Sequence, residues 1–195
     1  MIIFIKNPVK GKVKTRLAND IGESEALGVY QKLLEYTREV TTAVKADKML
    51  FYSETIEPDD EWSEEHYKKF VQKGNDLGQR MLNAFESTLQ KYDSALIIGS
   101  DCPGLDQSHI SEGFMSLRQS DVVIGPSEDG GYYLLGMNHL HEELFRNIKW
   151  SSESVLEETI QGCKNAGLSY QLLAQLNDID RATDLTDYPW LQSDG

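Results

Sequence analysis

Short apolar runs that alternate with amphipathic stretches are the feature that most limits the folds open to this chain. The runs with strand character are expected at residues 2–5, 48–52, 69–72, 95–98, 122–125, 132–136 and 169–173. Apolar residues recur at helical spacing between them, over residues 24–44, 77–89, 107–117 and 151–166. Strands with an apolar character on both faces that alternate with helices are typical of a mostly parallel sheet covered by helices on both sides. The sequence therefore predicts an α/β fold.

The bulk properties of the chain narrow its class further. A length of 195 residues suits one domain, which we expect to span residues 1–195. Two cysteines, Cys102 and Cys163, make no disulfide framework and indicate a reducing cytoplasm. We find no N-terminal signal peptide and no apolar run near the ~20 residues of a membrane helix. The net charge of −13 argues against a nucleic-acid partner, because duplex binding relies on lysine and arginine at the phosphates.

A cationic segment follows the first expected strand and contrasts with the rest of the chain. It holds five of the 19 lysine and arginine residues, namely Lys6, Lys10, Lys12, Lys14 and Arg16. No acidic residue precedes Asp20, so residues 20–195 carry all 32 aspartates and glutamates. Ligands of parallel α/β sheets bind at the carboxyl ends of strands, and a cationic segment there can bind phosphate. The alternative is a solvated basic loop, because runs of charge usually face water.

A carboxylate occupies the same kind of position after another apolar run. Residues 96–105 read LIIGSDCPGL and place Asp101 just beyond the expected strand. A carboxylate there can coordinate Mg²⁺, which prefers oxygen ligands and bridges to phosphates. It can equally be a turn or capping residue before Pro103. Cys102 fits a small buried residue better than a nucleophile, because no histidine partner is evident.

Three further loops carry carboxylates at the ends of expected elements. Residues 125–136 (GPSEDGGYYLLG) fit either a tight turn at the double glycine or the lining of an acceptor pocket. Residues 177–185 (NDIDRATDL) follow the last expected strand, and we expect one of Asp178 and Asp180 to face the site. Asp76, within QKGNDLGQRM, has the position of a helix N-cap.

Six segments in this order resemble a bacterial family of GT-A-like transferases within the nucleotide-diphospho-sugar transferase superfamily. They are KNPVKGKVKTRL, QKGNDLGQRM, GSDCPGL, GPSEDGGYYLLGM, WSSESVL and NDIDRATDL, and they run from residue 6 to residue 185. This family is related to the 2-phospholactate and molybdenum-cofactor guanylyltransferases. The resemblance implies a three-layer α/β/α domain that binds a nucleotide at the N-terminal half of the sheet.

The resemblance also implies roles for individual residues. Nucleotide contacts are implied for Lys6, Lys14, Arg16, Asp76 and Ser100. Catalytic roles are implied for Lys14, Arg16 and Asp101. A Mg²⁺ or Mn²⁺ ion is implied at Asp101 and Asp180, with Asp178 as the alternative to Asp180. The acceptor side is implied at Glu128, Asp129, Gly130 and Gly131.

These features together predict a metal-dependent transferase that uses a nucleotide-sugar or a nucleoside triphosphate and a small-molecule acceptor. A glycosyltransferase would break the sugar–phosphate bond and release a nucleoside diphosphate. A nucleotidyltransferase would direct attack at the α-phosphate and release pyrophosphate, and the fold alone fits both. A third possibility is a nucleotide-binding accessory protein without activity, against which the retained Asp101 and Asp180 argue.

Overall fold

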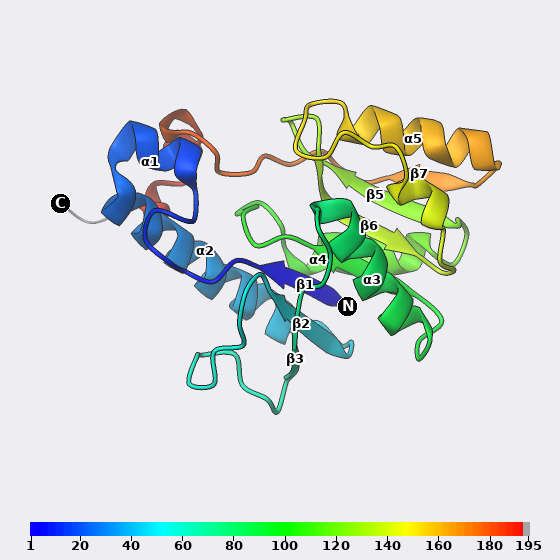
Figure 1. Cartoon of the computed structure of the whole chain (residues 1–195), viewed down its shortest axis with the longest axis horizontal. Helices are drawn as coiled ribbons and strands as arrows, with labels where there is room; N and C mark the ends of the chain where they lie inside the picture. The colour runs from blue at the N-terminus through cyan, green and yellow to red at the C-terminus, as the bar shows by residue number, and fades with distance from the viewer. Residues whose placement is uncertain (193–195) are drawn as a thin grey trace.

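A seven-stranded sheet forms the centre of the computed structural model, which describes residues 1–192. The strands are β1 (Ile2–Ile5), β2 (Lys48–Tyr52), β3 (Tyr67–Val71), β4 (Ala95–Ile98), β5 (Val122–Pro126), β6 (Tyr132–Met137) and β7 (Tyr170–Leu172). Their order across the sheet is β3-β2-β1-β4-β6-β5-β7 (Figure 1). Only β6 runs antiparallel to its neighbours, β4 and β5. The expected mostly parallel sheet is confirmed, and the last three residues of the expected domain lie outside the described residues.

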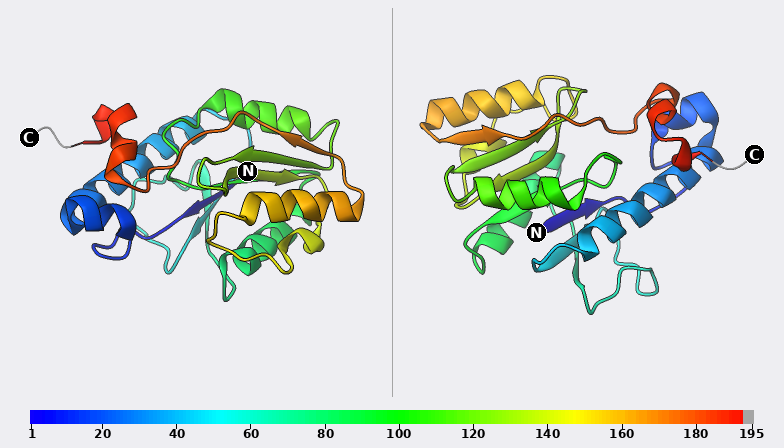
Figure 2. Two further views of the ribbon diagram at one scale, coloured as in Figure 1. Left: turned by 90° about the horizontal axis from the view of Figure 1, so that it is seen from above. Right: turned by 180° about the vertical axis from the view of Figure 1, so that it is seen from behind.

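Helices cover both faces of the sheet (Figure 2). The α-helices are α1 (Thr15–Ile21), α2 (Glu23–Thr42), α3 (Leu77–Leu89), α4 (Gln107–Ser116) and α5 (Val155–Ala166). Three short 3₁₀ helices lie in the second half of the chain, η1 (Glu142–Phe145), η2 (Ala182–Asp187) and η3 (Pro189–Leu191). Side chains of α2 and α4 pack with Ile3 of β1 on one face, whereas those of α3 and α5 pack with Ile2 on the other. Because successive residues of a strand point to opposite faces, β1 is buried on both sides, as expected.

Local sequence signals explain where the helices begin and end. The side chains of Asp76 and Asp106 cap α3 and α4 by accepting backbone N–H groups, and Gly167 ends α5 in the left-handed conformation. Helix α5 begins four residues later than expected, because Ser151 has a positive φ of 63° and the next residues form a turn. Within residues 1–192, no helix combines the length and the apolar character needed to cross a membrane.

The chain after β7 crosses back to the opposite end of the molecule, where it meets α1 (Figure 1). Ile179, Leu185 and Leu191 are buried in a separate apolar cluster with Leu17 of α1 and Leu33 of α2. This packing fixes the path of the C-terminal segment, and with it the position of the carboxylates on either side of Ile179.

Candidate functional site

The basic loop and Asp101 meet where β1 and β4 leave the sheet. From β1 the chain continues to β2 and β3 on one side, whereas β4 lies on the other side of β1. This is the point at which the strand order reverses, and open α/β sheets bind their ligands in the crevice at such a point. The basic loop, residues 6–16, follows β1, and Asp101 follows β4 by three residues. The expectation that each lies just beyond the carboxyl end of a strand is confirmed, and the structure shows that the two strands are neighbours.

Lys14 is the centre of this arrangement. Its ammonium Nζ lies 3.1 Å from Asp101 Oδ2, and the Lys14 side chain is only 5% exposed. Lys14 also has a positive φ of 47°, immediately before α1 begins at Thr15. A non-glycine residue in the left-handed region is uncommon, and such strain gathers at functional sites. The fold therefore holds this lysine in a costly conformation and aims its charge at Asp101.

The charge of Asp101 is stabilised by its neighbours. Burial alone would raise the pKa of this carboxyl, but the charge and hydrogen bond of Lys14 outweigh it, with a smaller contribution from Lys6. The net effect lowers the pKa of Asp101 below its ordinary value. The carboxylate is thus ionised near neutral pH, and it keeps 45% of its side-chain surface exposed.

The C-terminal segment brings two more carboxylates to the site. The Ile179 N–H donates to the Asp101 carbonyl oxygen at 3.0 Å, which places this segment beside the end of β4. Asp180 Oδ2 accepts from Arg16 Nη1 at 2.8 Å, and Asp178 Oδ2 accepts from Ser127 Oγ at 2.9 Å. We expected one of the two aspartates to face the site, and the structure brings both there, each with a different partner.

One carboxylate oxygen of Asp178 is left without a hydrogen-bond partner in the described part of the chain. Its Oδ1 is buried and has no hydrogen-bond partner within residues 1–192. Burial, followed by the negative charge of Asp101, raises the pKa of Asp178 to about 7. A buried carboxylate oxygen without a partner is costly, and a cation bound between Asp178 and Asp101 would supply one.

The oxygens of these two aspartates suit Mg²⁺ or Mn²⁺. Within residues 1–192, no three or more histidine, cysteine, aspartate or glutamate side chains gather closely enough to form a metal cage. Mg²⁺ is commonly bound by one or two carboxylates and completes its coordination with water and substrate phosphates. Asp101 and Asp178 fit that pattern. Asp180, like Asp101, is paired with a basic side chain, and only Asp178 has a buried carboxylate oxygen without a partner in residues 1–192.

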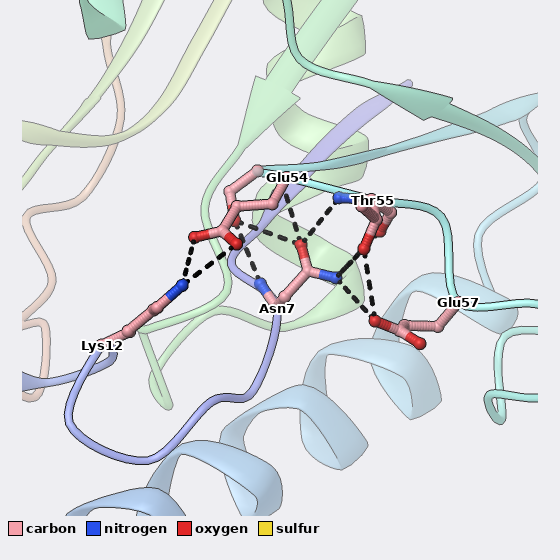
Figure 3. Close-up of polar contacts among 6 residues, drawn as sticks. Asn7, Lys12, Glu54, Thr55 and Glu57 are labelled. Atoms are coloured by element: carbon pink, nitrogen blue, oxygen red, sulfur yellow. Dashed lines mark hydrogen bonds and ion pairs between the residues drawn. The ribbon is translucent and has the colours of Figure 1, made fainter.

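The basic loop is anchored to the segment after β2 by a buried asparagine (Figure 3). The Asn7 side-chain amide donates to the Thr55 carbonyl oxygen at 2.8 Å and to Glu57 Oε1 at 3.1 Å, and its oxygen accepts from the Glu54 N–H at 3.0 Å. Lys12 Nζ reaches the Glu54 carboxylate at 3.3 Å. Two of the five basic side chains, Lys6 and Lys10, form no ion pair within the described residues.

Other expected site residues have structural partners. Asp76 is the N-cap of α3, as its spacing predicted, and its Oδ1 accepts from the Gln79 N–H at 2.8 Å. Ser100 is buried, and its hydroxyl lies 3.2 Å from Tyr30 Oη. Their implied nucleotide contacts remain predictions.

The double glycine forms the tight turn between β5 and β6. Gly130 has a φ of 85°, and a Cβ at this position would lie 2.1 Å from the Glu153 carbonyl oxygen. The Gly131 N–H donates to Asp129 Oδ1 at 2.9 Å. The turn explanation is confirmed, and the acceptor-side role of Glu128, Asp129, Gly130 and Gly131 remains a prediction.

Two polar residues at strand ends were missed in the sequence. Ser127 directly precedes Glu128 at the end of β5, and Asn7 follows Lys6 just after β1. The signal was available for both, because each is a hydrogen-bonding side chain just beyond an apolar strand. Their hydrogen-bond partners lie far away in the sequence, so the local pattern marks the two residues but not what they bind.

Solved structures with this fold include transferases. A putative nucleotide-diphospho-sugar transferase from Desulfovibrio desulfuricans G20 is 28% identical, with a TM-score of 0.88 over 96% of this chain and 85% of that chain. The inositol-1-phosphate CTP transferase from T. maritima is 13% identical, with a TM-score of 0.61 over 97% and 93% of the two chains. The 2-C-methyl-D-erythritol 4-phosphate cytidylyltransferase from Thermus thermophilus is 13% identical, with a TM-score of 0.56 over 95% and 94%. The last two likenesses show the fold alone.

These findings confirm the expected place of the chain among nucleotide-diphospho-sugar transferase-like folds. No functionally curated protein matches the chain. One family model matches residues 36–152, more than half of the sequence. The chain therefore belongs to the family described as "Uncharacterized protein conserved in bacteria (DUF2064)".

Proposed function

We propose that this protein is a metal-dependent transferase that acts on a nucleotide-sugar or a nucleoside triphosphate. The observation that carries the proposal is the ion pair between the buried Lys14 and the half-exposed Asp101 at the point of strand-order reversal, with the buried Asp178 oxygen that has no partner in residues 1–192. A cation-rich loop and two carboxylates face one another there, which is what a metal-bound diphosphate requires on its two sides.

In this proposal the basic loop binds the phosphates. Lys6 is exposed and without an ion pair in the described residues, so its ammonium is available to a ligand. An ammonium has three hydrogens to donate, so Lys14 would contact a phosphate oxygen while it keeps Asp101. Arg16 would exchange Asp180 for a phosphate oxygen, and both cations would stabilise the charge of the leaving group. Such preorganised charge stabilisation is worth about 10²–10³-fold in rate per group.

Asp101 and Asp178 are the residues we propose for the metal. The resemblance implied Asp180, with Asp178 as the alternative, and the buried oxygen of Asp178 that has no partner in residues 1–192 favours Asp178. When bound, Mg²⁺ or Mn²⁺ would neutralise phosphate charge and orient the phosphates. The protein contributes by holding its carboxylates in place, Asp101 through Lys14 and Asp178 through Ser127.

Nucleotidyl transfer is the second candidate. It is favoured by the structural likeness to CTP-dependent transferases over nearly the whole chain, although this likeness extends only to the fold. Release of pyrophosphate would identify it, whereas release of a nucleoside diphosphate would identify glycosyl transfer. A non-catalytic nucleotide-binding accessory protein would bind the same ligands and release neither.

A thermal-shift panel of nucleotides and nucleotide-sugars with Mg²⁺ and Mn²⁺ tests the proposal. A bound ligand raises the melting temperature by linkage, and the strongest ligand then indicates the donor class. Asp101→Asn should abolish the metal-dependent shift. Asp106→Asn is the matched control, because it removes the same charge five residues away while an asparagine can still cap α4.

The panel distinguishes a failure of the whole site from a failure of the role of Asp101 alone. No metal-dependent shift with any member of the panel would contradict the proposal for the whole site. A wild-type shift that persists undiminished in Asp101→Asn would contradict only the role of Asp101.

A further inference from the structure

A buried hydroxyl lies directly behind the proposed site. Tyr30 of α2 is 3% exposed, and its Oη accepts from the Lys6 N–H at 2.8 Å. The same hydroxyl donates to the Lys6 carbonyl oxygen at 3.1 Å and lies 3.2 Å from Ser100 Oγ. A phenol has one hydrogen to donate and can accept two, so these contacts use its full capacity if Ser100 donates.

These contacts join the two strands at the place where their own pairing stops. The parallel ladder between β1 and β4 pairs Ile2 with Ile97 and Ile3 with Ile98, and the described residues show no later pair between these strands. Lys6 lies just beyond β1, and Ser100 directly precedes Asp101. One side chain from α2 therefore spans the gap between the start of the basic loop and the carboxylate beside it.

We propose that Tyr30 is a positioning residue that fixes the basic loop relative to Asp101 and so sets the geometry of the nucleotide–metal site. The effect of Tyr30 on ligand binding rests on the proposed function, whereas its contacts to Lys6 and Ser100 exist without a ligand. The hydroxyl forms hydrogen bonds with both backbone groups of Lys6 and contacts the side chain of Ser100, the residue before Asp101. Burial raises the pKa of the Tyr30 phenol, and the nearby Asp101 charge adds to the effect, so the hydroxyl stays protonated and can donate throughout the neutral range.

The chain offers a matched control in Tyr67. Its hydroxyl is buried and makes three contacts, like that of Tyr30. These contacts are to residues of α2: Thr41 Oγ1 at 2.9 Å, Thr42 Oγ1 at 2.8 Å and the Arg38 carbonyl oxygen at 3.1 Å. Tyr67 is the first residue of β3, at the amino ends of the strands, whereas the site lies at their carboxyl ends. Removing either hydroxyl deletes a set of three hydrogen bonds, but only Tyr30 lies at the site.

The experiment compares Tyr30→Phe, Tyr67→Phe and the wild type by amide hydrogen exchange without any ligand. We expect Tyr30→Phe to speed exchange in both residues 6–14 and residues 99–105, and Tyr67→Phe to leave these two segments unchanged. Ser100→Ala is a milder variant that removes one contact and keeps the two bonds to Lys6, which guards against a loss of folding in Tyr30→Phe. Unchanged exchange in Tyr30→Phe and Ser100→Ala, or the same change in Tyr67→Phe, would overturn the inference.

The second measurement is the affinity for GTP, CTP and UDP-glucose, each with Mn²⁺. Tyr30→Phe should weaken binding of whichever probe the wild type binds about tenfold, as expected for a lost hydrogen bond that orders the site, and Tyr67→Phe should not. If exchange responds as expected but the wild type binds no probe, the proposed function fails and the positioning role stands. If the wild type binds a probe and Tyr30→Phe binds it equally well, the positioning role fails and the proposed function stands.

Discussion

Two ion pairs join the basic loop to the carboxylates, and they differ in burial. In the inner pair, Lys14–Asp101, the lysine side chain is 5% exposed; in the outer pair, Arg16–Asp180, the arginine is 59% exposed. Removing one partner of a buried pair leaves an uncompensated buried charge, whereas an exposed charge stays solvated by water. The inner pair is therefore the more costly of the two to break, and the outer pair can exchange partners at little cost.

The largest effect is expected from breaking the inner pair with Lys14→Met. The variant leaves Asp101 without its main counter-charge next to Asp178 and removes a proposed phosphate contact. We expect affinity for the metal–nucleotide complex to fall about 10²–10³-fold, as for other lost charge-stabilising groups. Isothermal titration calorimetry with Mn²⁺ and the preferred nucleotide measures it.

Lys10→Met is the control for that variant. This variant removes the same charge from the same loop, but Lys10 is exposed and forms no ion pair within residues 1–192. Equal losses in the two variants would show that only the net charge of the loop matters, and the distinction between buried and exposed lysines would then be wrong.

The two aspartates proposed for the metal, Asp101 and Asp178, should make opposite contributions to the pH dependence of stability. The pKa of Asp178 is about 7 in the folded protein, well above the ordinary value of about 3.9 for the unfolded chain. The folded state therefore binds the extra proton between these values, and Asp178 makes stability fall as pH rises from about 4 to 7, by at most about 1.4 kcal/mol per pH unit. The lowered pKa of Asp101 acts in the other direction, and its contribution is lost as the solution is acidified below about pH 4.

Asp178→Asn tests this contribution. Urea unfolding in EDTA, from pH 4 to pH 8, should show the variant gaining stability over the wild type until about pH 7 and holding a constant difference above it. Asp59→Asn removes the same charge from an exposed position and should track the wild type. A wild-type stability curve parallel to that of Asp178→Asn would mean that Asp178 is already ionised at low pH.

Much of the fold was predictable because its signals are local. The apolar runs located β1, β2 and β4 with their observed bounds, and Asp76 marked the start of α3. The start of α5 was predicted wrongly, because the turn before it depends on the positive φ of Ser151 and on packing against Gly130. Helix periodicity cannot reveal a constraint that comes from another part of the chain.

The candidate site likewise combines features with local sequence signals and features that depend on distant parts of the chain. Lys14, Arg16 and Asp101 could be predicted, because they follow apolar strands and carry charge. The contacts of Tyr30 and Ser127 could not, since their partners lie 70 and 51 residues away in the sequence. The choice between Asp178 and Asp180 also depended on long-range contacts, because both follow the same strand and only their partners distinguish them.

Breaking the outer pair with Arg16→Met should have a smaller effect than breaking the inner pair. Both side chains are at least one-third exposed, so stability should change by about 0–1 kcal/mol. Nucleotide affinity should fall about tenfold, because one charge-assisted contact to phosphate is lost. Arg181→Met is the matched control, since Arg181 forms a similarly exposed pair with Asp20, a residue of α1. A loss as large as that of Lys14→Met would remove the distinction between the two pairs.

The smallest effect is expected at a third pair, Lys12–Glu54, which joins the same basic loop to the segment after β2. Its two side chains are 59% and 54% exposed, and the loops are already held together by the buried Asn7 amide. A double-mutant cycle with Lys12→Met and Glu54→Gln should therefore give a coupling of about 0–1 kcal/mol, which falls further in high salt. Nucleotide affinity should stay unchanged in both variants. A coupling of the size expected for a buried pair would show that the Lys12–Glu54 pair stabilises the fold after all. A marked loss of affinity in Lys12→Met would show that Lys12 contributes to phosphate binding and is not a solvated charge.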